Sequence, residues 1–115
     1  RKSISSSFNK AVELILKLEG KLIFSGIGKS ALIARKASAT CSSVGVPSFF
    51  IDGNTWSHGD SGSVSKKDIV IVYSASGETK ELKNVINVCG RFGVKLISVT
   101  QKKIALYLKQ VMLVL

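Results

Sequence analysis

Three hydroxyl side chains around one glycine make residues 74–79 the segment best suited to hold an anion. The segment reads Ser-Ala-Ser-Gly-Glu-Thr, with hydroxyls at Ser74, Ser76 and Thr79. Gly77 permits a tight turn in which successive backbone amides face one point, as they do at helix N-termini that bind phosphate. The alternative is a serine-rich N-cap completed by a following glutamate, which many helices use without binding a ligand.

A second polar loop, residues 26–30, reads Gly-Ile-Gly-Lys-Ser. It does not match the GxGxxG dinucleotide pattern, because position 31 is Ala, nor the GxxxxGK[ST] nucleotide pattern, because position 23 is Ile. Lys29 and Ser30 still place a cation and a hydroxyl beside a helix start, where they suit a phosphate or a sugar hydroxyl. The alternative is an ordinary surface lysine.

The polar stretch over residues 52–65 contains His58 and Trp56, which are the single histidine and the single tryptophan of the chain. An irregular segment of this length is either a functional loop or a connecting loop. His58 is therefore either a site residue or a histidine that caps a turn or contacts a neighbouring subunit. For Trp56 we expect packing or an interface rather than a platform for a sugar.

Apolar runs and helical periodicities alternate along the chain and must position these loops. The expected strands are residues 22–25, 48–51, 68–73, 95–100 and 111–115; the expected helices are residues 8–18, 31–43, 79–90 and 104–110. This alternation predicts an α/β fold, a doubly wound parallel sheet in three layers, α/β/α, with residues 68–73 as a central strand. Ligands of such sheets bind beyond the carboxyl ends of the strands, where both polar loops are expected.

Composition narrows the classes of partner. The formal net charge is +10, from 17 Lys and Arg against 7 Asp and Glu, so the surface should attract anions. Nucleic-acid binding would rest on this charge alone, since no recognised reader module is present.

Charges interrupt every apolar stretch, which argues against a membrane span. One histidine and no ligand cluster argue against a metal, and Cys41 and Cys89 are expected as reduced thiols of a cytoplasmic protein.

Four segments, taken together and in order, resemble sugar isomerase (SIS) domains, and among them the arabinose-5-phosphate isomerases. They are residues 26–30, 47–50 (Pro-Ser-Phe-Phe), 57–60 (Ser-His-Gly-Asp) and 74–79. The resemblance extends from about residue 20 to residue 100. It implies a flavodoxin-like SIS sandwich, a homotetramer, and a single domain over residues 1–115 that lacks the C-terminal part of the family domain and the paired CBS region.

The resemblance also implies an enzyme that interconverts D-ribulose 5-phosphate and D-arabinose 5-phosphate for the lipopolysaccharide sugar KDO, without a cofactor. The phosphate would be held by Ser30, Ser74, Ser76 and Thr79. Aldose–ketose interconversion needs a base and groups that stabilise charge on oxygen. We assign Glu81 as the candidate base, His58 to ring opening or proton shuttling, and Lys29 to stabilising negative charge.

A second interpretation is a phosphosugar sensor without catalysis. The family usually has Glu three residues before the histidine, whereas this chain has Thr55. After Thr100 a Gly-Asn-Pro-like loop is usual, and here the sequence is Gln-Lys-Lys. The enzyme and the sensor therefore both remain open at the level of sequence.

Overall fold

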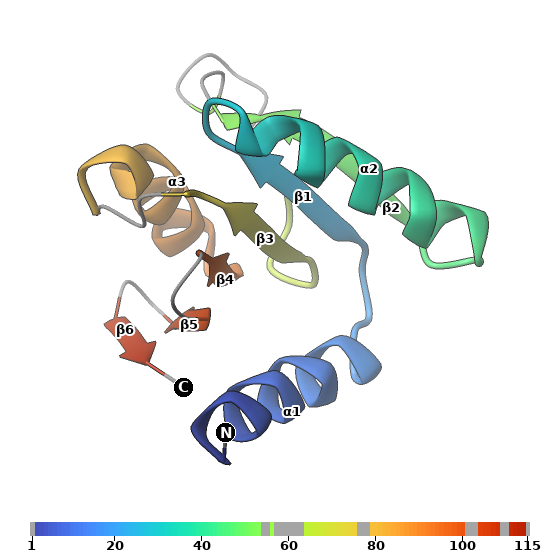
Figure 1. The fold of residues 1–115 in the computed structure, drawn as a ribbon, viewed down its shortest axis with the longest axis horizontal. Coiled ribbons are helices and arrows are strands. Elements are labelled where there is room, and N and C mark those ends of the chain that lie inside the picture. Colours follow the sequence, from blue (N-terminus) through green and yellow to red (C-terminus); the bar gives the residue numbers. More distant parts are fainter. Residues whose placement is uncertain are drawn as a thin grey trace.

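The computed structural model of the chain describes residues 2–53, 56, 64–75, 79–100, 104–108 and 111–114 (Figure 1). At residues 2–8, 79–82, 104–108 and 111–114 it describes the backbone. The helices are α1 (Lys2–Leu16), α2 (Ser30–Ser43) and α3 (Thr79–Phe92). The strands are β1 (Leu22–Gly26), β2 (Ser48–Asp52), β3 (Ile69–Tyr73), β4 (Lys95–Val99), β5 (Ile104–Leu108) and β6 (Val111–Val114).

These strands form one sheet in the order β2-β1-β3-β4-β5-β6. The first four are parallel, and β3 lies between β1 and β4, with Ile69 paired to Leu22 and to Lys95. Strand β3 is apolar throughout and its first four residues are buried, as expected for a strand covered on both faces. The predicted α/β fold with a central strand over residues 68–73 is confirmed.

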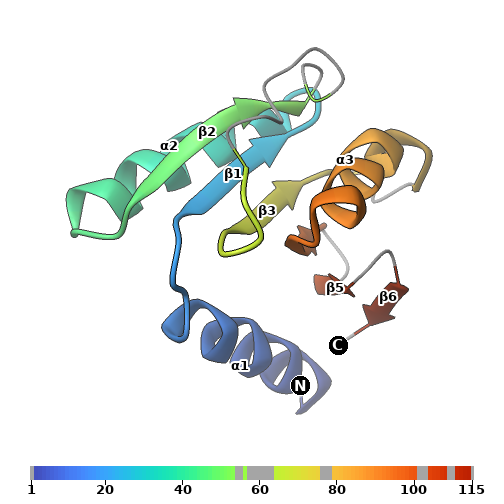
Figure 2. The same cartoon turned by 180° about the vertical axis from the view of Figure 1, so that it is seen from behind.

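Helices cover both faces of the sheet, which gives the predicted three layers. Figures 1 and 2, taken from opposite sides, show α2 and α3 on opposite faces of β1 and β3. Side chains alternate along each strand. Ile23 and Val72 therefore join the cluster containing Val85 of α3, whereas Phe24 joins the cluster containing Ala34 of α2.

Helix α2 lies close to the sheet because the residues it buries are small. They are Ser30, Ala34 and Ser38. Its large apolar side chains, Leu32 and Ile33, are exposed instead. Because α2 approaches so closely, its first residue, Ser30, lies against the carboxyl end of β1.

Helix α1 packs through the apolar positions that recur at helical spacing. Ala11 is buried and Leu14, Ile15 and Leu18 are half-buried against the cluster on the α2 face. The helix ends at Leu16, two residues before the end predicted at residue 18. Among the described helices, none combines the length and the apolar character needed to cross a membrane.

The helix predicted over residues 104–110 is wrong, because residues 104–108 form β5. This strand is antiparallel to β4, and β6 pairs antiparallel with β5, with Leu108 opposite Val111. Two apolar runs separated by only two residues suit a hairpin, which pairs both strands without a crossover. Residues 111–114 form the expected strand, but in an antiparallel extension of the parallel sheet rather than a further parallel unit.

Candidate functional site

The carboxyl ends of β1 and β2 are brought together by two glycines. A Cβ at Gly26 would lie 2.5 Å from the Cα of Ala31, so the strand end fits directly against the start of α2. A Cβ at Gly53 would collide with the carbonyl oxygen of Gly26. Gly28 adopts a φ of 65°, a left-handed conformation that favours glycine. Gly26 and Gly53 therefore allow a close approach of backbone segments at this edge, and we call residues 26–30 the glycine loop.

The first amides of α2 are already hydrogen bonded within this loop. Ser30, Ala31 and Leu32 donate to the carbonyl oxygens three residues earlier, at 3.1 to 3.3 Å. Lys29 has helical dihedrals and an exposed side chain, whereas Ser30 is 9% exposed. An anion at this loop would therefore be held by side chains more than by these three amides, in contrast to a typical phosphate-binding helix start.

A backbone hydrogen bond joins the loop over residues 26–30 to the last residue of β3, which directly precedes residues 74–79. The amide of Ile27 donates to the carbonyl of Tyr73 at 3.2 Å, and the amide of the next residue, Ser74, donates to Val99 at 3.0 Å. Ser74 is buried, at 2% exposure. The start of residues 74–79 therefore lies beside the glycine loop, and the expected shared edge of the sheet is confirmed.

The structure thus brings together Lys29, Ser30 and Ser74 at one edge. His58, Ser76 and Thr55 lie outside the described residues. Thr79 and Glu81 lie on the backbone of α3, which begins at Thr79, while their side chains are outside the description. The assignment of these residues to phosphate binding or catalysis therefore stays a prediction.

Trp56, which follows β2 in the sequence, packs into the core. Its side chain is 1% exposed in the cluster on the α3 face, and its indole Nε1–H donates to the Ser25 hydroxyl at 2.9 Å. The packing expected for Trp56 is confirmed. The partner was missed, because Ser25 sits inside an apolar run and nothing in the sequence pairs it with a residue 31 positions away. The only signal in the sequence for such a bond was a serine within an otherwise apolar strand.

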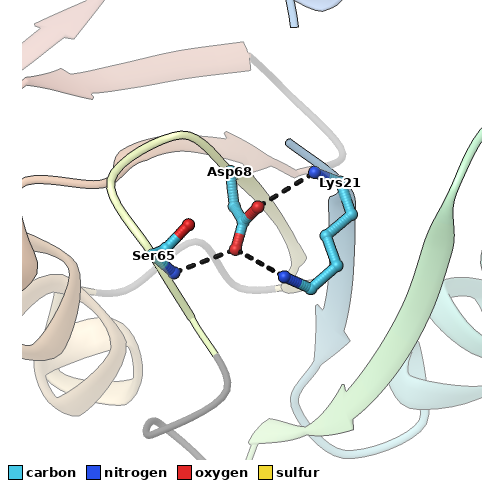
Figure 3. A network of polar contacts seen from close by, with 3 residues as sticks. All are labelled: Lys21, Ser65 and Asp68. Carbon is cyan, nitrogen blue, oxygen red and sulfur yellow. Dashed lines mark hydrogen bonds and ion pairs between the residues drawn. The ribbon is translucent and has the colours of Figure 1, made fainter. Parts of the chain in front are cut away.

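A charged cluster lies at the opposite edge of the sheet, where the strands begin (Figure 3). Asp68 is 1% exposed and accepts hydrogen bonds from the Lys21 amide, the Lys21 ammonium and the Ser65 amide, at 2.9, 3.1 and 2.9 Å. Burial opposes ionisation of this carboxyl, but the backbone donors and the Lys21 ammonium outweigh it and hold its pKa below the usual value. Gly20 fits here because a Cβ would collide with Asp68 Oδ1.

The two cysteines are free, as expected, with Cys41 half-buried in α2 and Cys89 buried in α3. Burial raises the pKa of the Cys89 thiol to about 12. Within the described ranges, no three His, Cys, Asp or Glu side chains come together as metal ligands.

The fold and the paired loops define an α/β domain with a polar site at the carboxyl ends of parallel strands. The model of the SIS domain family matches residues 15–106, and the chain belongs to this family. The resemblance inferred from the four segments is thereby confirmed.

Several of its curated relatives are named as isomerases. The chain is 44% identical over 100 residues to the Haemophilus influenzae protein named "Probable arabinose 5-phosphate isomerase", covering 87% of this chain and 30% of the relative. It is 41% identical over 97 residues to arabinose 5-phosphate isomerase KdsD of Pseudomonas aeruginosa, covering 84% of this chain and again 30% of the relative. The chain therefore spans about a third of the length of these curated relatives.

A solved structure has the same fold. The Escherichia coli CFT073 protein c3406, determined in complex with arabinose 5-phosphate, superposes with a TM-score of 0.79 at 40% identity, over 88% of this chain and 57% of that one. The family and the α/β/α architecture therefore rest on sequence and structure together.

Proposed function

We propose that this chain forms the phosphosugar-binding part of an aldose–ketose isomerase that interconverts D-ribulose 5-phosphate and D-arabinose 5-phosphate. The observation that carries the proposal is the hydrogen bond from Ile27 to Tyr73, which sets the glycine loop beside Ser74. Two polar loops at one sheet edge form the arrangement in which doubly wound folds bind ligands. The relatives named as arabinose 5-phosphate isomerases supply the substrate class.

In this proposal the phosphate is held by Ser30, Ser74, Ser76 and Thr79. Hydroxyl donors to a charged phosphate form short, strong hydrogen bonds. Burial of Ser30 and Ser74 lowers the competition from water for these bonds. The exposed Lys29 adds positive charge at the mouth of the same loop.

The chemistry proceeds through an enediol. Glu81 removes the proton from the carbon beside the carbonyl and returns it to the neighbouring carbon, so that the base is regenerated. His58 moves the compensating proton between the two oxygens or assists ring opening, and Lys29 stabilises the negative charge on oxygen. In the same proposal the protein is a cytoplasmic homotetramer that serves KDO synthesis for lipopolysaccharide, and residues 1–115 belong to a single SIS domain.

The substrate class is tested by thermal unfolding with arabinose 5-phosphate and with unphosphorylated arabinose. A ligand at 100 times its dissociation constant stabilises the folded state by about 2.7 kcal/mol. We expect a shift with the phosphorylated sugar alone. Equal shifts with both sugars would refute recognition through the phosphate.

The catalytic assignment is tested with Glu81→Gln, in a protein long enough to complete the site. We expect ketose formation to fall by at least about 100-fold, the typical contribution of a general base, while phosphosugar affinity is kept. Glu13→Gln, on the exposed side of α1, is the matched control. Full turnover in Glu81→Gln would show that another group is the base.

The second candidate function is a phosphosugar sensor. Thr55, in the position where the family usually has Glu, favours it. Tight binding without turnover in the parent protein, at the length used for the Glu81→Gln test, would select the sensor over the enzyme.

A further inference from the structure

A concave surface lined by lysines lies at the edge of the sheet opposite the proposed phosphosugar site. The cavity measures about 340 Å³, within the size range of small-molecule sites. Its lysines come from three separate segments: Lys17 follows α1, Lys66 and Lys67 precede β3, and Lys95 begins β4. Strand β3 separates this cavity from Tyr73 by about 13 Å, at about 3.3 Å per residue.

The positive charge of the cavity is only partly neutralised. Glu19 and Asp68 are its lining carboxylates, and Asp68 is already paired with Lys21 at 3.1 Å. In the part of the chain that the structure describes, Lys66 and Lys67 make no ion pair. Lysines that line one concave surface concentrate positive potential there and raise the local concentration of anions.

The backbone that carries these lysines is held by hydrogen bonds. The carbonyl of Lys67 accepts from the Gly20 amide at 3.0 Å, and the Lys17 amide donates to Glu13 at 3.2 Å. The Asp68 amide donates to Ser65 at 3.0 Å and closes the turn that contains Lys66. A ligand would therefore have to order the lysine side chains, whereas the backbone that carries them is already fixed.

The remaining lining is apolar. Leu14 and Leu18 of the α1 region are half-buried and Ile69 is buried, so the cavity combines an apolar wall with a cationic rim. Inorganic phosphate would use the rim alone. A molecule with both an apolar group and several negative charges would use the rim and the wall together.

We propose that this cavity, which we call the lysine cavity, binds a small organic anion of the nucleoside-phosphate class. Its phosphates contact Lys66 and Lys67 at the rim, and its base lies against Leu18 and Ile69. This binding is independent of the proposed phosphosugar site, since the two lie at opposite ends of the parallel strands.

The test is calorimetric titration of the protein with adenosine triphosphate, inorganic triphosphate and adenosine. We expect adenosine triphosphate to bind most tightly, because it alone uses both parts of the cavity. Lys66→Gln/Lys67→Gln should weaken its binding by about tenfold, since two exposed charge pairs are lost. Both lysines are exposed, so the variant should keep the parental unfolding temperature.

The matched control removes the same charge elsewhere. Lys10→Gln/Lys36→Gln changes two exposed lysines on α1 and α2 that do not line the cavity, and it should change the affinity by less than about twofold. Equal weakening in both double variants would reduce the effect to general charge attraction and overturn the proposal. Equal affinity for inorganic triphosphate and adenosine triphosphate would overturn the role of the apolar wall.

A competition titration separates this site from the proposed function. Saturating arabinose 5-phosphate should leave the affinity for adenosine triphosphate unchanged. Displacement by the sugar phosphate would show that the nucleotide occupies the phosphosugar site, and the lysine cavity would be refuted. A failure of arabinose 5-phosphate to bind would refute the proposed function while leaving the nucleotide result to stand by itself.

Discussion

Asp68 holds both the backbone and the side chain of Lys21. Its Oδ1 accepts from the Lys21 amide at 2.9 Å and its Oδ2 accepts from the Lys21 ammonium at 3.1 Å. Lys21 directly precedes β1 and Asp68 directly precedes β3, so one carboxylate aligns the starts of two neighbouring parallel strands (Figure 3).

The first prediction concerns acid stability. The pKa of Asp68 is lower in the folded state than in the unfolded state. Its ionised carboxylate therefore stabilises the fold fully above the unfolded-state pKa near 4, and this stabilisation is lost as the pH falls through the folded-state pKa. Asp68→Asn should therefore lower the free energy of unfolding at pH 7 by about 2–4 kcal/mol, because the charge-assisted hydrogen bonds are lost. Urea unfolding from pH 7 to pH 2 should show the difference between parent and variant shrinking below pH 4. Glu19→Gln, an exposed neighbour, should differ from the parent by less than about 0.5 kcal/mol.

The second prediction separates two reasons for glycine in the loop over residues 26–30. Gly26→Ala forces a Cβ to within 2.5 Å of the Ala31 backbone and should cost about 1–3 kcal/mol of stability. Gly28→Ala meets no atom within 4 Å and should cost about 1 kcal/mol, from its φ of 65° alone. Gly28→Asn should recover part of that loss, since Asn tolerates this conformation. The stability of all three variants is measured from their urea unfolding midpoints. An equal loss of stability in Gly28→Asn and Gly28→Ala would contradict the conformational explanation.

The third prediction concerns Trp56 and Ser25. Trp56→Phe removes the Nε1–H donor, and Ser25→Ala removes its acceptor. A double-mutant cycle by urea unfolding should give a coupling of about 1 kcal/mol, the usual net value of a hydrogen bond. Additive losses would mean that the two side chains stabilise the fold independently of the 2.9 Å contact.

The fourth prediction distinguishes the two thiols. With a pKa of about 12, Cys89 is thiolate to a fraction of only about 10⁻⁴ at pH 8, and it is also buried. Iodoacetamide should therefore label Cys41 first, as followed by peptide mass spectrometry. Labelling of Cys89 should match the rate of global unfolding and increase in urea. Labelling of both residues at one rate in the native protein would be inconsistent with this burial.

Local patterns were sufficient for the elements between residues 22 and 99. The continuous apolar run of β3 and the glycines after β1 are local signals, and both gave the correct element and the correct edge of the sheet. The hairpin of β5 and β6 was missed because its apolar residues fit a short helix as well as a strand. Pairing with β4 decides between them, and that contact is tertiary.

The site was predictable in part for the same reason. Ser30 and Ser74 were recognised by residue type beside glycine turns, and the backbone hydrogen bond from Ile27 to Tyr73 then brings them to one edge. The Trp56–Ser25 bond and the Asp68–Lys21 pair span 31 and 47 residues, and neither has a local pattern. Long-range polar partners of this kind depend on the packed sheet itself.

The separation between Lys21 and Asp68 also bears on the order of folding. Pairing β1 with β3 closes a chain segment of more than 40 residues that includes α2 and β2, whereas β5 and β6 meet across a two-residue connection. Closure of a long segment has an entropic cost that must be met before its contacts stabilise anything, and hairpins form within microseconds. The C-terminal hairpin can therefore form early, and alignment of the two central strands by Asp68 is the contact that should limit the folding rate.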